Sequence, residues 1–140
     1  MQLVSYLGRN LKSDAVIEVL ECFHMDVIYD FDRLNENTTD TYSSSAKSAG
    51  FEFRFDERQI LSVIWCYIQP RSGFLAIDSD VPGVPCFNDF SGAKSYATNA
   101  GIKTSQAKDG AAWIRFEQEG VWTRYQFSGD QLELVTLTLP

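Results

Sequence analysis

The strongest constraint on the fold is a regular alternation of large apolar and charged residues that begins at Phe51. Three phenylalanines alternate with a glutamate and an arginine in residues 51–55, FEFRF. A repeat of two residues is that of a β-strand with one buried face. Residues 60–68, ILSVIWCYI, are apolar on both faces, which is typical of a strand covered on both sides. The sequence therefore predicts two strands, the second of them in the middle of a sheet.

The last thirty residues show three further alternating segments. Strands are predicted over 112–118, 121–127 and 131–139, with turns at 119–120 and 128–130. Because short turns join antiparallel neighbours, these segments are expected to form a meander. Its core-facing side chains are expected to be Ile114, Phe116, Val121, Tyr125, Phe127, Val135, Leu137 and Leu139.

Two helices are predicted beside these strands. Residues 13–23, SDAVIEVLECF, place apolar side chains at helical spacing after Ser13, a favourable N-cap. A second short helix is expected over 91–101, beginning at Ser91 and ending with Gly101 as its C-cap. The fold class is therefore α+β: a largely antiparallel twisted sheet of about five or six strands with an N-terminal helix and a second short helix packed on it. One domain is expected over residues 1–140.

The remaining segments are expected to be edge strands and loops. Residues 26–34, DVIYDFDRL, alternate as a strand with one solvent-exposed face, and residues 74–77 are expected to add a short edge strand. The polar stretches 35–50 and 101–110 are predicted to be surface loops, the first with a short helical piece before Gly50.

The negative charge of the chain is concentrated in one stretch. Residues 14–40 hold eight of the 19 acidic residues and one of the 12 basic residues, Arg33, so this stretch alone accounts for the net charge of −7. Such a field repels nucleic acid and anionic membranes and attracts a basic protein. Simple solubility is the alternative explanation. The predicted partner-binding acids are Glu18, Glu21, Asp26, Asp30, Asp32, Glu36 and Asp40.

The sequence contains no convincing catalytic centre. The single histidine, His24, lies two residues after Cys22 at the end of a predicted helix, where a partly buried thiol and a capping imidazole are the ordinary explanation. The three cysteines lack the paired spacing of structural zinc sites. No catalytic residue, no resident metal and no cofactor are therefore predicted.

Two pairs of aspartates could hold a divalent cation. Asp30 and Asp32 lie on one face of an extended segment, as do Asp78 and Asp80. This spacing arises readily by chance, and the first pair lies within a segment already rich in acids. Solvated charge is thus the preferred explanation, with a metal-assisted enzyme as the alternative.

The sequence also favours a cytoplasmic location. Its first residues lack the basic start and apolar stretch of a secretory signal, and residues 60–68 are too short to span a bilayer. An odd number of cysteines without CxxC spacing suits reduced, buried thiols.

Aromatic and basic residues alternate in the C-terminal meander. The composition of a nucleic-acid surface is approached by Trp113, Arg115, Trp122, Arg124 and Tyr125, but the net charge opposes that function. Cross-strand pairing on the outer face of a sheet explains them better. Arg115 or Arg124 is expected to lie near Glu117 and Glu133 on the outer face. Trp113 and Trp122 are candidate anchors of a protein interface.

Four segments together resemble the small cytoplasmic immunity proteins of bacterial polymorphic toxin systems, including those of contact-dependent growth inhibition. They are the start LGRNLKSDAVIEVL, the strand pair SAGFEFRFDERQILSVIWCYI, the stretch VPGVPCFNDFSGAKSYATNAGI and the meander AWIRFEQEGVWTRYQFSGDQLELVTLTL. The likeness covers most of the chain and lies in pattern and spacing. Where relatives of this type tend to have Leu-Gly-x-Pro after the second helix, this chain has Ala-Gly-Ile-Lys at 100–103.

The resemblance implies a protein that neutralises a cognate toxin by blocking its active site or substrate surface. The acidic stretch favours a basic toxin such as a nuclease, since complementary charge speeds capture. A small-ligand-binding or scaffold module of the cytoplasm is the alternative. The sequence leaves homo-oligomerisation open.

Overall fold

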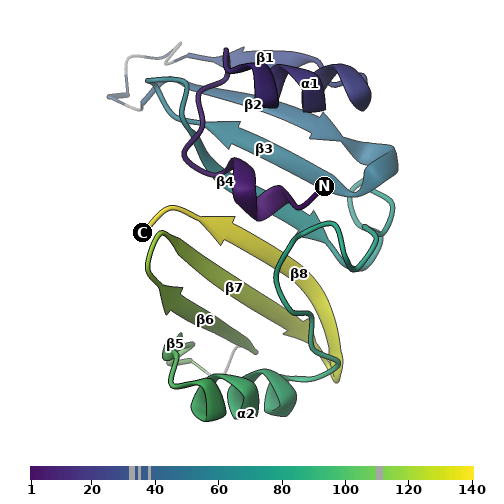
Figure 1. Ribbon diagram of the computed structural model, residues 1–140, viewed down its shortest axis with the longest axis vertical. Helices are drawn as coiled ribbons and strands as arrows, with labels where there is room; N and C mark the ends of the chain where they lie inside the picture. Colours follow the sequence, from purple (N-terminus) through teal and green to yellow (C-terminus); the bar gives the residue numbers. More distant parts are fainter. Residues whose placement is uncertain (32–33, 35, 38, 110–111) are drawn as a thin grey trace.

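The computed structural model describes the chain from residue 1 to 140, apart from residues 32–33, 35, 38 and 110–111. Eight strands form one antiparallel sheet in the order β1-β2-β3-β4-β8-β7-β6-β5 (Figure 1). The strands are β1 (Val27–Asp30), β2 (Thr41–Ala46), β3 (Phe51–Phe55), β4 (Leu61–Tyr67), β5 (Lys103–Gln106), β6 (Trp113–Gln118), β7 (Val121–Ser128) and β8 (Gln131–Thr138). The predicted class and the antiparallel arrangement are confirmed, but five or six strands was too few.

The strands predicted from strong alternation are all present. β3 pairs with β4, and β6, β7 and β8 form the expected meander. β4 and β8 lie at the centre and join the two halves of the sheet. β4 is covered less than expected, because Leu61, Ile64 and Cys66 are buried whereas Val63 and Trp65 are only half-buried. Of the predicted core residues, Val121 and Leu139 are also only half-buried.

Two predicted loops contain strands. β2 and β5 are rich in serine and threonine, so they lack the apolar alternation that identified the other strands. β2 lies between β1 and β3, and β5 pairs with β6. Backbone pairing to neighbours therefore makes these polar segments into strands. The predicted short helical piece before Gly50 is present as a 3-10 turn, Lys47–Ala49.

Two edge predictions were wrong in part. Residues 74–77 form no strand and contribute only an isolated bridge between Arg71 and Phe74. Phe74 is buried there and stacks on Tyr67 at a ring-centroid distance of 4.2 Å.

β1 is a strand, but all four of its residues are exposed instead of one face alone. β1 is the last strand of the sheet, and in the described part of the chain it pairs with β2 alone.

Two α-helices pack on one face of the sheet. α1 (Asp14–Cys22) begins after Ser13, whose hydroxyl accepts a hydrogen bond from the Val16 N–H as predicted. The prediction of an N-terminal helix was wrong in part, because the first element is a 3-10 turn, Leu3–Tyr6, that precedes α1. α2 (Phe90–Ala100) ends at Gly101 in the left-handed conformation. Its N-cap is Asp89 and not Ser91, since the Asp89 carboxylate accepts from the Gly92 N–H at 2.7 Å.

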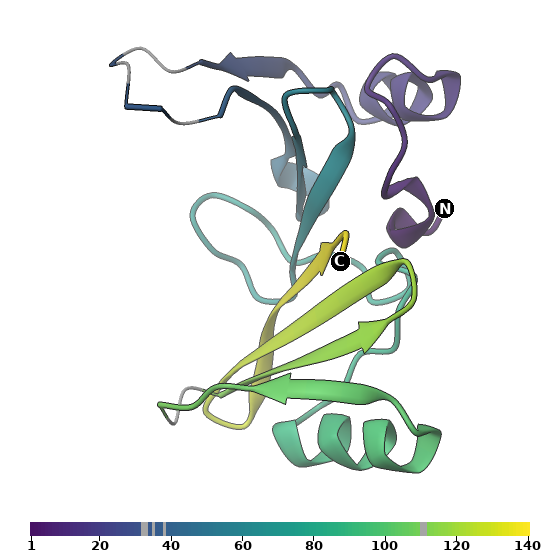
Figure 2. The same cartoon turned by 90° about the vertical axis from the view of Figure 1, so that its left-hand side faces the viewer.

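The buried side chains form one cluster between the helices and the sheet. The helices and the Leu3–Tyr6 turn all lie on the same side of the sheet (Figure 2). Residues from the first turn to the last strand join this core, among them Leu3, Val16, Phe53, Phe116 and Leu137. The other side of the sheet carries no α-helix in the described part of the chain. We call this side the open face.

Candidate functional site: the acidic edge of the sheet

The outer edge of β1 brings acidic and apolar side chains together. We define the acidic edge as β1 together with Glu21, Asp26 and Asp40, which adjoin it in α1, in the turn before β1 and in the segment before β2. Ser43, on β2, donates a hydrogen bond to the Asp30 carboxylate at 3.2 Å. The register of β1 on β2 therefore fixes the position of the edge carboxylates relative to the sheet.

The same edge exposes a concentration of large apolar side chains. Val27, Ile28 and Tyr29 of β1 are 41%, 59% and 47% exposed. Ile17 on α1 and the nearby residues Phe31 and Leu34 are exposed as well. An apolar surface bordered by charge is typical of a protein interaction site. The sequence reasoning missed this feature, because the alternation in residues 26–34 indicated one buried face.

Tyr29 links β1 to the segment before β2. Its hydroxyl donates a hydrogen bond to Asp40 Oδ2 at 2.6 Å, and its ring stacks on Tyr42 at a centroid distance of 5.0 Å. The hydrogen bond to the Asp40 carboxylate, with the negative charge of that group, raises the pKa of the Tyr29 phenol. The phenol therefore stays protonated at neutral pH and holds the carboxylate beside the strand.

Two shallow grooves flank Asp26. One, on the α1 side, is lined by Ile17, Leu20, Glu21, His24, Met25 and Asp26. The other is larger, about 770 Å³, and lies between β1 and the loop after β4, with Ile28, Glu52 and Phe74 in its walls. His24 and Asp26 line both grooves. His24 has a φ of 52°, a left-handed backbone that turns the chain from α1 into β1.

The structure gathers some of the predicted partner-binding acids and separates others. Glu21, Asp26, Asp30 and Asp40 lie along the acidic edge, as described above. Glu18 is exposed on α1, and Glu36 is exposed in the segment between β1 and β2. Asp32 lies outside the described residues. Whether these acids bind a partner stays a prediction.

The two predicted interface tryptophans lie elsewhere, on the open face of β6 and β7. The Arg115 guanidinium lies 4.1 Å from the ring centroid of Trp122, and that of Arg124 lies 4.6 Å from Trp113. A third pair, Arg54 over Trp65, extends this arrangement to β3 and β4. Arg115 and Arg124 are directly opposite in the ladder, so stacking on separate rings offsets their like-charge repulsion.

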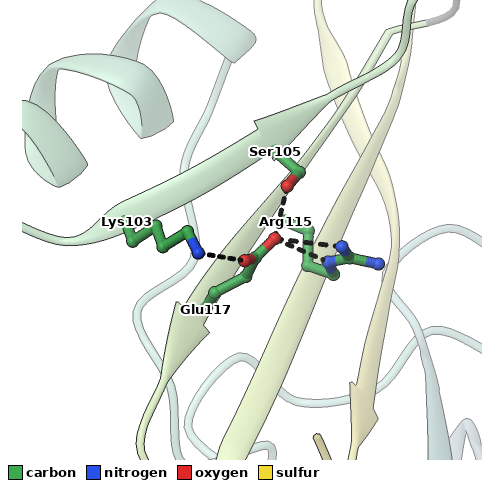
Figure 3. Close-up of polar contacts among 4 residues, drawn as sticks. All are labelled: Lys103, Ser105, Arg115 and Glu117. Carbon is green, nitrogen blue, oxygen red and sulfur yellow. Dashed lines mark hydrogen bonds and ion pairs between the residues drawn. The ribbon is translucent and has the colours of Figure 1, made fainter.

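A polar cluster of side chains stabilises the pairing of β5 with β6 (Figure 3). The Glu117 carboxylate accepts hydrogen bonds from Ser105 and from Arg115, the latter at 3.0 Å, and pairs with Lys103 at 3.7 Å. These hydrogen bonds, from Ser105 first and then Arg115, lower the pKa of Glu117. The expected contact between Arg115 and an outer-face glutamate is confirmed. Glu133 pairs instead with Arg71, at 3.6 Å.

The candidate catalytic groups do not assemble into a centre. Cys22 and His24 are both exposed, and no hydrogen bond joins them in the described part of the chain. All three cysteines are free, but only Cys66 is buried, which raises the pKa of its thiol. Among the described residues, no three His, Cys, Asp or Glu side chains lie close enough to hold a metal ion. Asp78 and Asp80 are exposed.

Comparison of the chain with protein-family models, with curated protein sequences and with solved structures gave no significant match. Within the described residues, neither helix has the length and apolar character needed to cross a membrane.

Proposed function

We propose that this protein is an immunity protein that binds and neutralises a cognate bacterial toxin in the cytoplasm. The observation that carries the proposal is the acidic edge, where exposed Val27, Ile28 and Tyr29 lie among Asp26, Asp30 and Asp40. Apolar contacts supply binding energy when they are desolvated, and acids around them select a basic partner and speed its approach. Such a role requires no catalytic residue and no cofactor.

The charge distribution suits an inhibitor of a basic toxin such as a nuclease. The described acids of residues 14–40 lie near one end of the sheet, whereas β5 to β8 carry Lys103, Arg115 and Arg124 together with Glu117 and Glu133. A toxin attracted to the acidic end would be oriented before contact. Once the toxin is bound at the acidic edge, the rest of the sheet would block its active site or its substrate surface sterically.

The test uses the product of the gene adjacent to this one as the candidate toxin. Asp26, Asp30 and Asp40 are replaced together by Asn, and association is measured by stopped flow at low and high salt. The triple variant is expected to associate about tenfold more slowly at low salt and to lose most of the salt dependence. The matched control neutralises Asp78, Asp80 and Glu119, which are exposed acids outside the acidic edge. Equal rates for the edge variant and the wild-type protein would contradict the proposal.

A small-ligand-binding module is the second candidate, favoured by the groove of about 770 Å³ between β1 and the loop after β4. Its volume falls within the range of small-molecule sites. Glu52→Gln alters the wall of this groove and leaves the side chains of β1 unchanged. Loss of toxin neutralisation in an Asp30→Asn, Asp40→Asn variant, without loss in Glu52→Gln, favours the immunity role, because Asp30 and Asp40 do not line the groove.

A further inference from the structure

The outer side of β1 is an unpaired strand edge. In the described part of the chain, no backbone hydrogen bond joins residues 27–30 to any segment other than β2. All four residues are exposed, and the strand contains no proline or lysine. Proteins usually protect such an edge with those residues, with a covering segment or with charge, because its free N–H and C=O groups pair readily with another chain.

We infer that the acidic edge binds its partner by strand addition, so that an extended basic segment becomes a ninth strand beside β1. This inference rests on the proposed function and names the mode of contact. Addition of a strand to an exposed edge is an established form of protein recognition, in which main-chain hydrogen bonds supply affinity and alternate side chains supply specificity.

The side chains of β1 define the segment that fits. Ile28 and Asp30 lie opposite Ser43 and Thr41 and point to the open face, and alternation puts Asp26 on the same side. Val27 and Tyr29 point to the other face. On the face that meets Asp26, Ile28 and Asp30, the complementary strand therefore carries two basic residues with an apolar residue between them. On the face that meets Val27 and Tyr29, it carries apolar or aromatic residues.

The same charges disfavour pairing between two copies of this protein. An antiparallel β1 pair centred on Ile28, with both open faces on one side, puts Asp26 opposite Asp30 of the second copy at both ends. Like charges directly opposite one another destabilise a strand pair. The charges thus destabilise this pairing of two copies and favour pairing with a strand of opposite charge.

The inference is tested with a capped peptide of about seven residues, Val-Lys-Val-Val-Val-Lys-Val, whose first face carries a valine between two lysines and whose second face carries valine alone. A second peptide carries the same side chains but has N-methylated central amides, which removes its main-chain donors and keeps its charge. A third replaces lysine by glutamate. Binding to the full-length protein is followed by amide NMR shifts and amide hydrogen exchange at Val27–Asp30, with Lys103–Gln106 of β5 as the internal reference.

The first peptide is expected to shift and protect the β1 amides and to leave those of β5 unchanged. N-methylation is expected to weaken binding by about tenfold or more, the equivalent of one or two lost hydrogen bonds. The glutamate peptide is expected not to bind. Equal affinity for the first two peptides, or no change at β1 at millimolar peptide, overturns strand addition.

The outcomes separate this inference from the proposed function. If the toxin candidate binds and is neutralised but no peptide pairs with β1, strand addition is wrong and the immunity role stands. If the lysine peptide pairs with β1 but the candidate toxin does not bind, the edge accepts strands and the immunity role is wrong.

Discussion

The two ends of the sheet differ in how their last strand is held. β5 is fastened to β6 by the contacts of Glu117 with Ser105, Arg115 and Lys103, and α2 packs beneath this end. Among the described residues β1 pairs with β2 alone, and it exposes Val27, Ile28 and Tyr29. Both strands have four residues, so length alone does not distinguish them.

The difference shows where the stability of this fold is concentrated. At the β5 end, Phe116 is buried among Phe87, Tyr96 and Tyr125. At the β1 end, Tyr29 contacts Phe31 and Tyr42, and both Tyr29 and Phe31 are about half exposed whereas Tyr42 is half-buried. Burial of aromatic surface provides most of the packing energy of a core. The β5 end is therefore expected to be structural, and the β1 end is left available for binding.

The largest effect is expected from Phe116→Ala. Phe116 is 2% exposed, so its removal leaves a cavity between α2 and the sheet and is expected to lower the free energy of unfolding by about 3–5 kcal/mol. Urea unfolding followed by tryptophan fluorescence measures this change. Phe116→Leu keeps most of the volume and should lose much less. A decrease of under about 1 kcal/mol in the free energy of unfolding of Phe116→Ala would show that the β5 end is not the more strongly packed of the two.

A smaller loss is expected from Glu117→Gln, and it should depend on pH. The folded protein holds the pKa of Glu117 below its ordinary value of 4.5, so the carboxylate stabilises the fold above that pH. This contribution disappears as the pH falls through the lowered pKa. The stability gap between the wild type and Glu117→Gln is therefore expected at pH 7 and should close towards pH 3.

Urea denaturation midpoints at a series of pH values measure that gap. Glu119→Gln is the control, because Glu119 is an exposed residue of the neighbouring turn and forms no ion pair within the described part of the chain. A gap for Glu117→Gln that is the same at pH 3 and pH 7 would show that the carboxylate charge does not fasten β5.

A loss of about 1 kcal/mol or less is expected from Tyr29→Ala, the aromatic truncation at the opposite end. The ring is about half exposed, so its removal opens no cavity. Tyr29→Phe keeps the stacking on Tyr42 and removes the hydrogen bond to Asp40. Thermal unfolding compares both variants with Phe116→Ala, and a loss as large as that of the core variant would show that the β1 end is structural too.

The smallest effect is expected from Asp26→Asn combined with Asp30→Asn. Removal of these charges relieves the repulsion between two β1 edges, and weak self-association is expected at high protein concentration. Sedimentation equilibrium at low salt measures it, with the Asp78→Asn, Asp80→Asn protein as the control. If the neutral edge stays as monomeric as the wild type, charge is not what protects β1 from its own copy.

Much of the fold could be predicted from local pattern. Residues 51–55 and the meander alternate strongly because their side chains face a core on one side, and the apolar run at 61–67 marks the central strand β4. Ser13 also marks the start of α1 correctly. β2 and β5 could not be found in this way, because their side chains are mainly polar and their strand conformation comes from pairing with neighbours.

The candidate site was predictable in its charge but not in its shape. The excess of acids in residues 14–40 is a property of the sequence. The position of Asp40 beside Tyr29 and of Asp30 beside Ser43 depends on the register of β1 on β2, a strand that the sequence did not indicate. The Arg–Trp stacks across β3, β4, β6 and β7 likewise depend on strand order.

The sequence by itself determined the antiparallel α+β class, the strongest strands and the location of the negative charge. These follow from side-chain periodicity and composition, which act over a few residues. Only the tertiary structure decided that β1 is the last strand, that its apolar residues remain exposed and that Glu117 fastens the opposite edge. Strand order and cover arise from contacts between residues far apart in the chain, and no local pattern records which strand is left without a second neighbour.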